Sequence, residues 1–181
     1  MKPKIACIGW GSLIWNPKGL KIQNKWFESG PILPIEFTRI SKDNRVTLII
    51  DNEAKPIRTL WALMTCDDIE EAINSLRDRE GTKKTDIHSI DQREDTKDEI
   101  KIDIQKWLKE KNIDTAIWTG LSFSEKTDSK RPSIDAIISH LKKIEYRERV
   151  LAEEYIRKAP IQVDTEYRRR IEFEFGWTST K

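Results

Sequence analysis

The sequence has few of the residues that bind metals or form disulfide bonds. Its 181 residues include two cysteines, Cys7 and Cys66, and two histidines, His88 and His140. Two cysteines are too few for a disulfide framework, so we expect both to be buried thiols in a reducing compartment. Because neither histidine is paired with a cysteine at ligand spacing, a structural zinc site is not expected. We predict that the protein uses no metal and no cofactor.

The chain also lacks long apolar runs and an excess of charge of one sign. No stretch approaches the roughly 20 apolar residues of a membrane-spanning helix, and the apolar run after Lys4 is too short for a signal peptide. The 33 basic residues nearly balance the 31 acidic ones. We therefore expect a cytoplasmic protein that binds neither nucleic acid nor a membrane. The basic cluster Arg168-Arg169-Arg170 is interpreted as a solvated helix face.

A chain of this length typically forms one domain that buries a sizeable core. We predict a single domain over residues 1–181, in which residues 122–181 form a mainly helical C-terminal extension packed on the rest. Seven tryptophans are many for this length and indicate large apolar walls in a core or a pocket. Exposed tryptophans would equally suit the interface of a homodimer.

The first part of the chain has the pattern of strands. Residues 5–8 form an apolar run that is long enough for a buried strand and too short for a helix. Residues 33–41 alternate and place Phe37 and Arg39 on one face. The turn signal Asp43-Asn44 then precedes a second β-rich run, which predicts a hairpin. With a further extended run over residues 56–64, we expect four strands before the first helix.

The remainder is predicted to be mainly helical. We expect a helix that begins near Thr65 or Asp67 and ends at Gly81, then helices over 98–111, 133–144, 145–158 and 165–175, and a buried strand over 113–121. For residues 165–175 a strand also fits the pattern, and the helix is preferred. The polar stretch 82–97 is predicted to be either a mobile lid or a disordered loop.

Glu80 occupies an unusual position on the first of these helices. The apolar stripe Ile69, Ala72, Ile73 and Leu76 continues at helical spacing to Glu80, so an acid stands where a hydrophobe is expected. In one interpretation the last turn frays, and Glu80 reaches solvent or pairs with Arg77 or Arg79. In the other, its carboxylate is aimed into the domain, where desolvation suits it to general acid/base work.

A glycine loop follows the first strand. In Gly9-Trp10-Gly11-Ser12-Leu13 we expect the two glycines to adopt backbone angles closed to other residues, so that amides turn outward and bind an anion or a polarised carbonyl. The alternative is a tight turn whose aromatic and aliphatic residues are core packing. A dinucleotide fingerprint, a P-loop and a nucleophile elbow are each excluded by missing residues.

The glycine loop and the pair Arg79-Glu80 occur in an order that resembles the gamma-glutamylcyclotransferase-like superfamily, especially its ChaC-like branch. The likeness covers Ile5 to Gly81, and Trp10 stands where that branch has a tyrosine. The resemblance implies an α+β fold, a small mixed β-barrel with flanking helices. It also implies a small-molecule γ-glutamyl substrate, as in glutathione metabolism, from which 5-oxoproline is released.

The resemblance further assigns roles to particular residues. Glu80 would be the catalytic general acid/base, and Gly9, Trp10, Gly11, Ser12 and Leu13 would bind the substrate. Arg39 and Ser41 would line the same pocket, or else be ordinary residues of a strand face. A non-catalytic small-molecule binding domain on the same fold is the competing hypothesis. A cysteine-dependent enzyme using Cys7 is a third, although no base is evident near Cys7 in the sequence.

Overall fold

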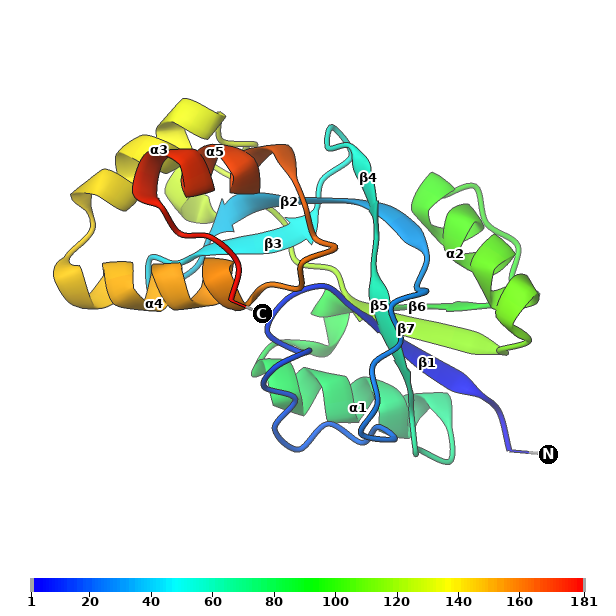
Figure 1. Cartoon of the computed structure of the whole chain (residues 1–181). Helices are drawn as coiled ribbons and strands as arrows, with labels where there is room; N and C mark the ends of the chain where they lie inside the picture. The colour runs from blue at the N-terminus through cyan, green and yellow to red at the C-terminus, as the bar shows by residue number, and fades with distance from the viewer. Residues whose placement is uncertain (1, 181) are drawn as a thin grey trace. The chain divides into compact units, whose positions relative to one another are not determined.

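The computed structural model describes residues 2–180, and over this range the protein is mixed α+β with two sheets and five α-helices (Figure 1). This confirms the expected α+β class, and the small mixed β-barrel stays a prediction. Internal contacts divide the chain into two compact units, each discontinuous in sequence. Unit 1 contains Met1–Gly9, Asn16–Leu33 and Arg58–Gly120, and unit 2 contains Trp10–Trp15, Pro34–Ile57 and Leu121–Lys181. The C-terminal segment therefore shares a unit with the glycine loop and the hairpin, and a single domain over the whole chain stays a prediction.

Unit 1 is built on a four-stranded sheet. Its strands, in spatial order, are β5 (Leu60–Leu63), β1 (Ile5–Gly9), β7 (Thr115–Thr119) and β6 (Ile87–Asp91). β1 is parallel to β7 and antiparallel to β5, and β6 is antiparallel to β7. The two central strands are buried almost throughout, which explains why their sequences are apolar runs without alternation. The predicted strands in these two regions are confirmed.

Two helices, α1 (Ile69–Glu80) and α2 (Glu99–Lys111), cover opposite faces of this sheet (Figure 1). The side chain of Asp68 caps α1 by accepting a hydrogen bond from the backbone N–H of Glu71 at 2.8 Å. The helix thus begins later than predicted, because Asp68 is the side chain that reaches a free amide. Gly81 ends the helix in the left-handed conformation, with φ of 61°, as expected.

The prediction of a lid or disordered loop over residues 82–97 is wrong for its central part. A short 3-10 turn, η1 (Lys84–Asp86), leads into β6. β6 pairs antiparallel with β7 and buries Ile87 and Ile90. Two isoleucines among polar residues do not indicate a strand by themselves. The strand forms because β7 offers it a backbone hydrogen-bonding edge, which the local sequence does not reveal.

The connection over residues 16–31, which follows the glycine loop, has little regular structure, as expected. Hydrogen bonds attach it to α1. Lys21 donates its backbone N–H to Ser75 Oγ at 3.0 Å and its Nζ to Glu71 Oε1 at 2.6 Å. Isolated bridges then join Ile22 to Met64 and Phe27 to Trp61. The segment is therefore fixed to both α1 and β5 within unit 1.

Gly30 lies where a side chain would strike the main chain, and we expect Gly30→Ala to destabilise the protein by about 1 to 3 kcal/mol. A Cβ at this position would be 2.6 Å from the carbonyl oxygen of Thr59, which also accepts the Gly30 N–H at 3.0 Å. Relief of the clash would break that hydrogen bond. Urea unfolding measures the effect, with Gly19→Ala as control because nothing lies within 4 Å of its Cβ position. Equal unfolding midpoints for the two variants would contradict the expected clash.

Unit 2 contains most of the second sheet, in which β2 (Ile32–Ile40) lies between β3 (Val46–Ile50) and β4 (Pro56–Arg58). The predicted hairpin is confirmed, since β2 and β3 are antiparallel and Asn44 takes a left-handed turn conformation with φ of 62°. The extended run 56–64 forms two strands, β4 and β5, separated at Thr59. Five strands therefore precede the first helix, instead of the predicted four.

A β-bulge in β2 changes which residues share a face. Glu36 pairs with Ile49 and Arg39 pairs with Thr47, so β2 has one extra residue between the two pairs. Arg39 consequently lies on the face of Glu36 and not on that of Phe37. The predicted alternation is wrong from this point onward, because a bulge shifts the period of two by one residue.

Three helices complete unit 2: α3 (Ile134–Lys143), α4 (Tyr146–Lys158) and α5 (Glu166–Phe175). Figure 1 shows α4 on one side of the hairpin and α3 and α5 on the other. The ring of Phe37 meets that of Tyr155 on α4 at a centroid distance of 6.3 Å. The preferred helix near the C-terminus is confirmed, with Thr165 as its N-cap. None of the helices described for residues 2–180 has the length and apolar character needed to cross a bilayer.

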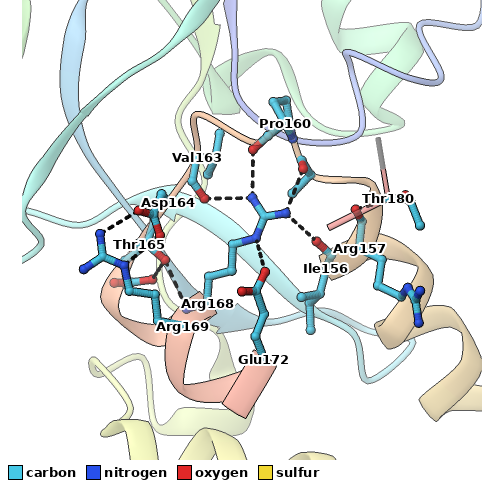
Figure 2. A network of polar contacts seen from close by, with 12 residues as sticks. Ile156, Arg157, Pro160, Val163, Asp164, Thr165, Arg168, Arg169, Glu172 and Thr180 are labelled. Atoms are coloured by element: carbon cyan, nitrogen blue, oxygen red, sulfur yellow. Dashed lines mark hydrogen bonds and ion pairs between the residues drawn. The ribbon is translucent and has the colours of Figure 1, made fainter. Parts of the chain in front are cut away.

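Arg168 of α5 is buried, at 2% exposure, so the interpretation of its basic cluster as a solvated helix face is wrong for this residue. All five N–H groups of its guanidinium have an oxygen acceptor (Figure 2). The acceptors are the carbonyl oxygens of Ile156, Ala159, Pro160 and Val163 and a carboxylate oxygen of Glu172, at 2.7 to 3.3 Å. The cation lies at the C-terminal end of α4, where the helix leaves carbonyls without partners, and it ties α5 to that end.

Glu36 is a second buried charged residue of unit 2, at 2% exposure. Its carboxylate accepts hydrogen bonds from the backbone N–H groups of Phe37 and Tyr167 and from the hydroxyl of Thr165. The carboxylate thus joins β2 to the N-terminus of α5, where a negative charge is favoured. Burial is the largest influence and raises the pKa of Glu36 above 4.5, although these hydrogen bonds act in the opposite direction.

This raised pKa gives Glu36 a defined effect on stability. The folded protein holds the Glu36 proton more tightly than the unfolded chain does. The stability that Glu36 contributes is therefore greatest at acidic pH and declines as the pH rises from 4.5 through the folded pKa. Glu36→Gln removes this titration, so we expect the stability of the wild type relative to the variant to decrease between acidic and neutral pH. Urea unfolding across that range measures the difference, and a difference that increased with pH would contradict the assignment.

Candidate functional site

The glycine loop is divided between the units, since Gly9 ends β1 in unit 1 and Trp10–Trp15 belong to unit 2. Within unit 2 the loop closes with a hydrogen bond from the Ile14 N–H to the Gly11 carbonyl at 3.0 Å. Trp10 and Leu13 are buried, and Ser12 is half-buried. The indole N–H of Trp10 donates to the Leu48 carbonyl of β3 at 3.4 Å. Trp10 thus holds the loop on the hairpin of unit 2.

Gly11 is required for a different reason from the one predicted. Neither Gly9 nor Gly11 has the left-handed backbone angles that were expected, because Gly81 and Gly176 are the described glycines with positive φ. A Cβ at Gly11 would overlap the hydroxyl oxygen of Tyr155 on α4. Gly11 therefore provides space for a side chain that approaches the loop backbone closely.

Glu80 lies in unit 1 and combines features of both interpretations of this residue. Its side chain is 18% exposed, so it is largely withheld from solvent. Its Oε1 accepts a hydrogen bond from Nη1 of Arg79 at 2.6 Å, and the side chain of Arg79 is only 6% exposed. Helical spacing places Arg79 beside Glu80, and its long side chain covers the carboxylate. The result is a shielded ion pair at the C-terminal end of α1.

Arg79 also binds the main chain just after the glycine loop. Its Nε and Nη2 donate to the carbonyl oxygen of Asn16 at 3.2 and 2.6 Å. Asn16 is the first residue of unit 1 after the loop. One guanidinium therefore fixes both the Glu80 carboxylate and the point at which the chain re-enters unit 1.

The charges of Glu80 and Arg79 act on the thiol of Cys7 in β1. Burial is the main cause that raises the pKa of the Cys7 thiol, the charge of Glu80 raises it further, and Arg79 acts in the opposite direction. Cys7 lies two residues before Gly9 on the same strand. A buried thiol with a raised pKa stays protonated and is a poor nucleophile, which disfavours a cysteine-dependent enzyme.

The two remaining predicted residues, Arg39 and Ser41, lie in the hairpin of unit 2. The hydroxyl of Ser41 donates to Asp43 Oδ1 at 2.5 Å and lies 3.0 Å from the Arg45 carbonyl oxygen, so it stabilises the turn between β2 and β3. Arg39 has a buried Nε with no hydrogen-bond partner among residues 2–180. Because of the bulge, the side chain of Arg39 lies on one face of the sheet and that of Leu48 on the other. Leu48 is the residue whose carbonyl accepts the indole N–H of Trp10 in the glycine loop.

The predicted site residues Glu80 and Gly11 therefore belong to two separate local groups, one in each unit. Glu80 belongs to a group with Arg79, Asn16 and Cys7 in unit 1, and Gly11 belongs to a group with Tyr155 in unit 2. Among residues 2–180 no cluster of three or more histidine, cysteine, aspartate or glutamate side chains could hold a metal ion.

One contact and one contributor of these groups were missed in the sequence. Arg79 was expected to flank Glu80 or to pair with it, but its bond to the Asn16 carbonyl could not be anticipated from helical angles. Tyr155 was not singled out at all, because an aromatic residue within an amphipathic helix has the pattern of core packing.

Comparisons with known proteins add no family assignment. The chain matches no protein-family model, and neither a curated protein nor a solved structure matches it significantly.

Proposed function

We propose that the protein is a γ-glutamyl cyclotransferase-type enzyme of the cytoplasm, with the β-barrel fold that its motifs resemble, and that it releases 5-oxoproline from a γ-glutamyl peptide or amine. The observation that carries the proposal is the environment of Glu80. This carboxylate is 18% exposed, ends a helix whose other inward residues are apolar, and lies near β1 where the glycine loop begins. A carboxylate that is largely withheld from solvent at the end of an apolar helix face is a candidate for general acid/base work.

In the proposed reaction, Glu80 takes a proton from the α-ammonium group of the substrate. The free amine attacks the γ-carbonyl carbon and forms the ring C–N bond. The ring nitrogen then loses its second proton as the γ-amide C–N bond breaks, and the leaving amine takes up both protons and departs as an ammonium. The motif resemblance assigns stabilisation of the oxyanion that develops on the γ-carbonyl oxygen to backbone amides of the glycine loop. The reaction is an internal acyl transfer, so no oxidant, reductant or water is consumed.

A non-catalytic small-molecule binding domain is the second candidate, and the Arg79–Glu80 ion pair favours it. The Arg79 guanidinium lies 2.6 Å from the Glu80 carboxylate and occupies one of its oxygen atoms with a hydrogen bond. For the enzyme, substrate binding would have to replace or loosen this contact. For a binding domain the pair would remain intact and would serve structure alone.

The deciding experiment incubates the protein with a panel of γ-glutamyl peptides and amines and measures 5-oxoproline. Isothermal titration calorimetry with the same panel and with 5-oxoproline measures binding separately. Production of 5-oxoproline supports the enzyme, and binding without product supports the binding domain. If no member of the panel binds or reacts, both functions are overturned.

A further inference from the structure

The helix α4 has one buried face and one exposed face, and the exposed face carries large apolar side chains. Figure 1 shows α4 against one side of the hairpin of unit 2, and its residues Ala152 and Ile156 are buried. Tyr146, by contrast, is 80% exposed, and Val150 and Leu151 are each 45% exposed. Large apolar side chains that are exposed together on one helix indicate an interaction surface.

Two opposite charges lie on the same face, symmetrically about its apolar centre. Arg147 and Glu154 are both exposed, and at about 100° per residue they project only about 20° apart. The apolar pair Val150 and Leu151 lies between them along the helix axis. Each charged residue is about 5 Å along the axis from the midpoint of this pair. A two-fold axis through that midpoint therefore places Arg147 of one copy opposite Glu154 of a second, antiparallel copy.

Arg147 is the one basic residue of α4 without an acceptor among residues 2–180. The other three, Arg149, Arg157 and Lys158, each donate to an oxygen of a nearby residue at 2.6 to 2.9 Å. Glu154 accepts the bond from Lys158 through Oε1, and a carboxylate has further lone pairs for a second donor. A second copy of the helix would supply the carboxylate that Arg147 lacks.

We propose that the exposed face of α4 is the interface of a homodimer, in which two α4 helices pack antiparallel across a two-fold axis. Val150 of one protomer contacts Leu151 of the partner subunit, and Arg147 pairs with Glu154 of the partner subunit. Both contacts occur twice, because a two-fold interface uses the same surface of each protomer. The ring of Tyr146 extends the apolar contact by one helical turn. This inference is independent of the proposed function.

A second copy of the chain fits this face better than a membrane surface does. Amphipathic helices that lie on membranes have polar faces rich in lysine and arginine. On α4 the acidic Glu154 lies at the centre of the exposed face and balances Arg147. The 13-residue helix is about 20 Å long, so the contact is small for a protein interface. We therefore expect a reversible dimer with a dissociation constant in the micromolar range.

Leu151→Glu tests the apolar part of the interface by sedimentation velocity of the full chain at about 1 to 200 µM. A carboxylate at this position would be buried against apolar side chains, so we expect the dimer dissociation constant to rise by about 100-fold. The fold should be retained in circular dichroism, because Leu151 is exposed in the protomer. Phe173→Glu is the matched control, since Phe173 is 81% exposed on α5.

The outcomes of this experiment are distinct. A wild type that dimerises, a Leu151→Glu variant that does not and a Phe173→Glu variant that does support the proposal. A dimer that survives Leu151→Glu, or that Phe173→Glu dissociates equally, places the interface elsewhere and overturns it. A wild type that is monomeric at every concentration also overturns it, and co-sedimentation with phosphatidylserine vesicles would then assign the face to a membrane.

Charge reversal tests the antiparallel arrangement. Arg147→Glu and Glu154→Arg each place like charges opposite one another in the dimer, so we expect either change to raise the dissociation constant by about 10-fold. The double variant restores opposite charges and should recover most of the affinity. The two positions are seven residues apart and do not contact each other within one helix, so recovery would report a contact between copies. A double variant that dimerises no better than the single variants would overturn the antiparallel pairing.

Discussion

Glu80→Gln is expected to reduce the rate of 5-oxoproline formation by about 10²- to 10⁴-fold, the usual contribution of a positioned proton-transfer group. The amide that replaces the carboxylate has nearly the same shape, and its oxygen can still accept the bond from Arg79. It cannot take a proton from the substrate amine. The loss should therefore appear in kcat, while circular dichroism shows an unchanged fold.

The matched control for this variant is Glu70→Gln on the same helix. Glu70 is exposed and pairs with Lys84 at the surface, so its replacement should leave turnover unchanged. Full activity of Glu80→Gln would remove Glu80 from the mechanism. Equal losses in the two variants would show that the effect comes from α1 in general and not from proton transfer by Glu80.

Arg168→Leu is expected to destabilise unit 2 by about 3 to 5 kcal/mol, the usual effect of removing one partner from a buried ionic network. The substitution leaves four buried carbonyl oxygens and the Glu172 carboxylate without their donor. Each unsatisfied group has a desolvation cost that leucine cannot offset. Urea unfolding followed by circular dichroism measures the loss.

Arg169→Leu is the control for this second prediction, because Arg169 is exposed and pairs with Asp164 at the surface. We expect its effect to stay within about 1 kcal/mol, as for other solvent-exposed ion pairs. Similar unfolding midpoints for the two leucine variants would show that the buried guanidinium does not join α5 to α4.

Local sequence was sufficient for most of the helices. Most helices lie where local signals predicted them, because these signals act within one or two turns. They are the cap at Thr165, the stop at Gly81 and the periodic apolar residues of α1 to α5. The strand β6 could not be predicted in the same way. Its residues are mostly polar, and it exists because β7 provides an edge for pairing.

Sequence patterns did not predict where certain side chains lie relative to residues outside their own strand or helix. Alternation predicted the face of Arg39 until a bulge in β2 reversed it. Composition suggested a solvated Arg168, whereas the end of α4 and the following turn surround it with carbonyl acceptors. Tyr155 has no local sign of a role, because the residue it meets, Gly11, is remote in the chain.

The sequence by itself determined the α+β class, the hairpin, most of the helix boundaries and the candidacy of Glu80, because capping, turn chemistry and apolar spacing act between near neighbours. Only the tertiary structure decided that Arg79 shields Glu80, that Arg168 is buried and that a tyrosine hydroxyl covers Gly11. The contacts of Arg79 with Asn16 and of Tyr155 with Gly11 join residues far apart in the chain. They depend on how packed elements present their side chains to one another, which no local pattern encodes.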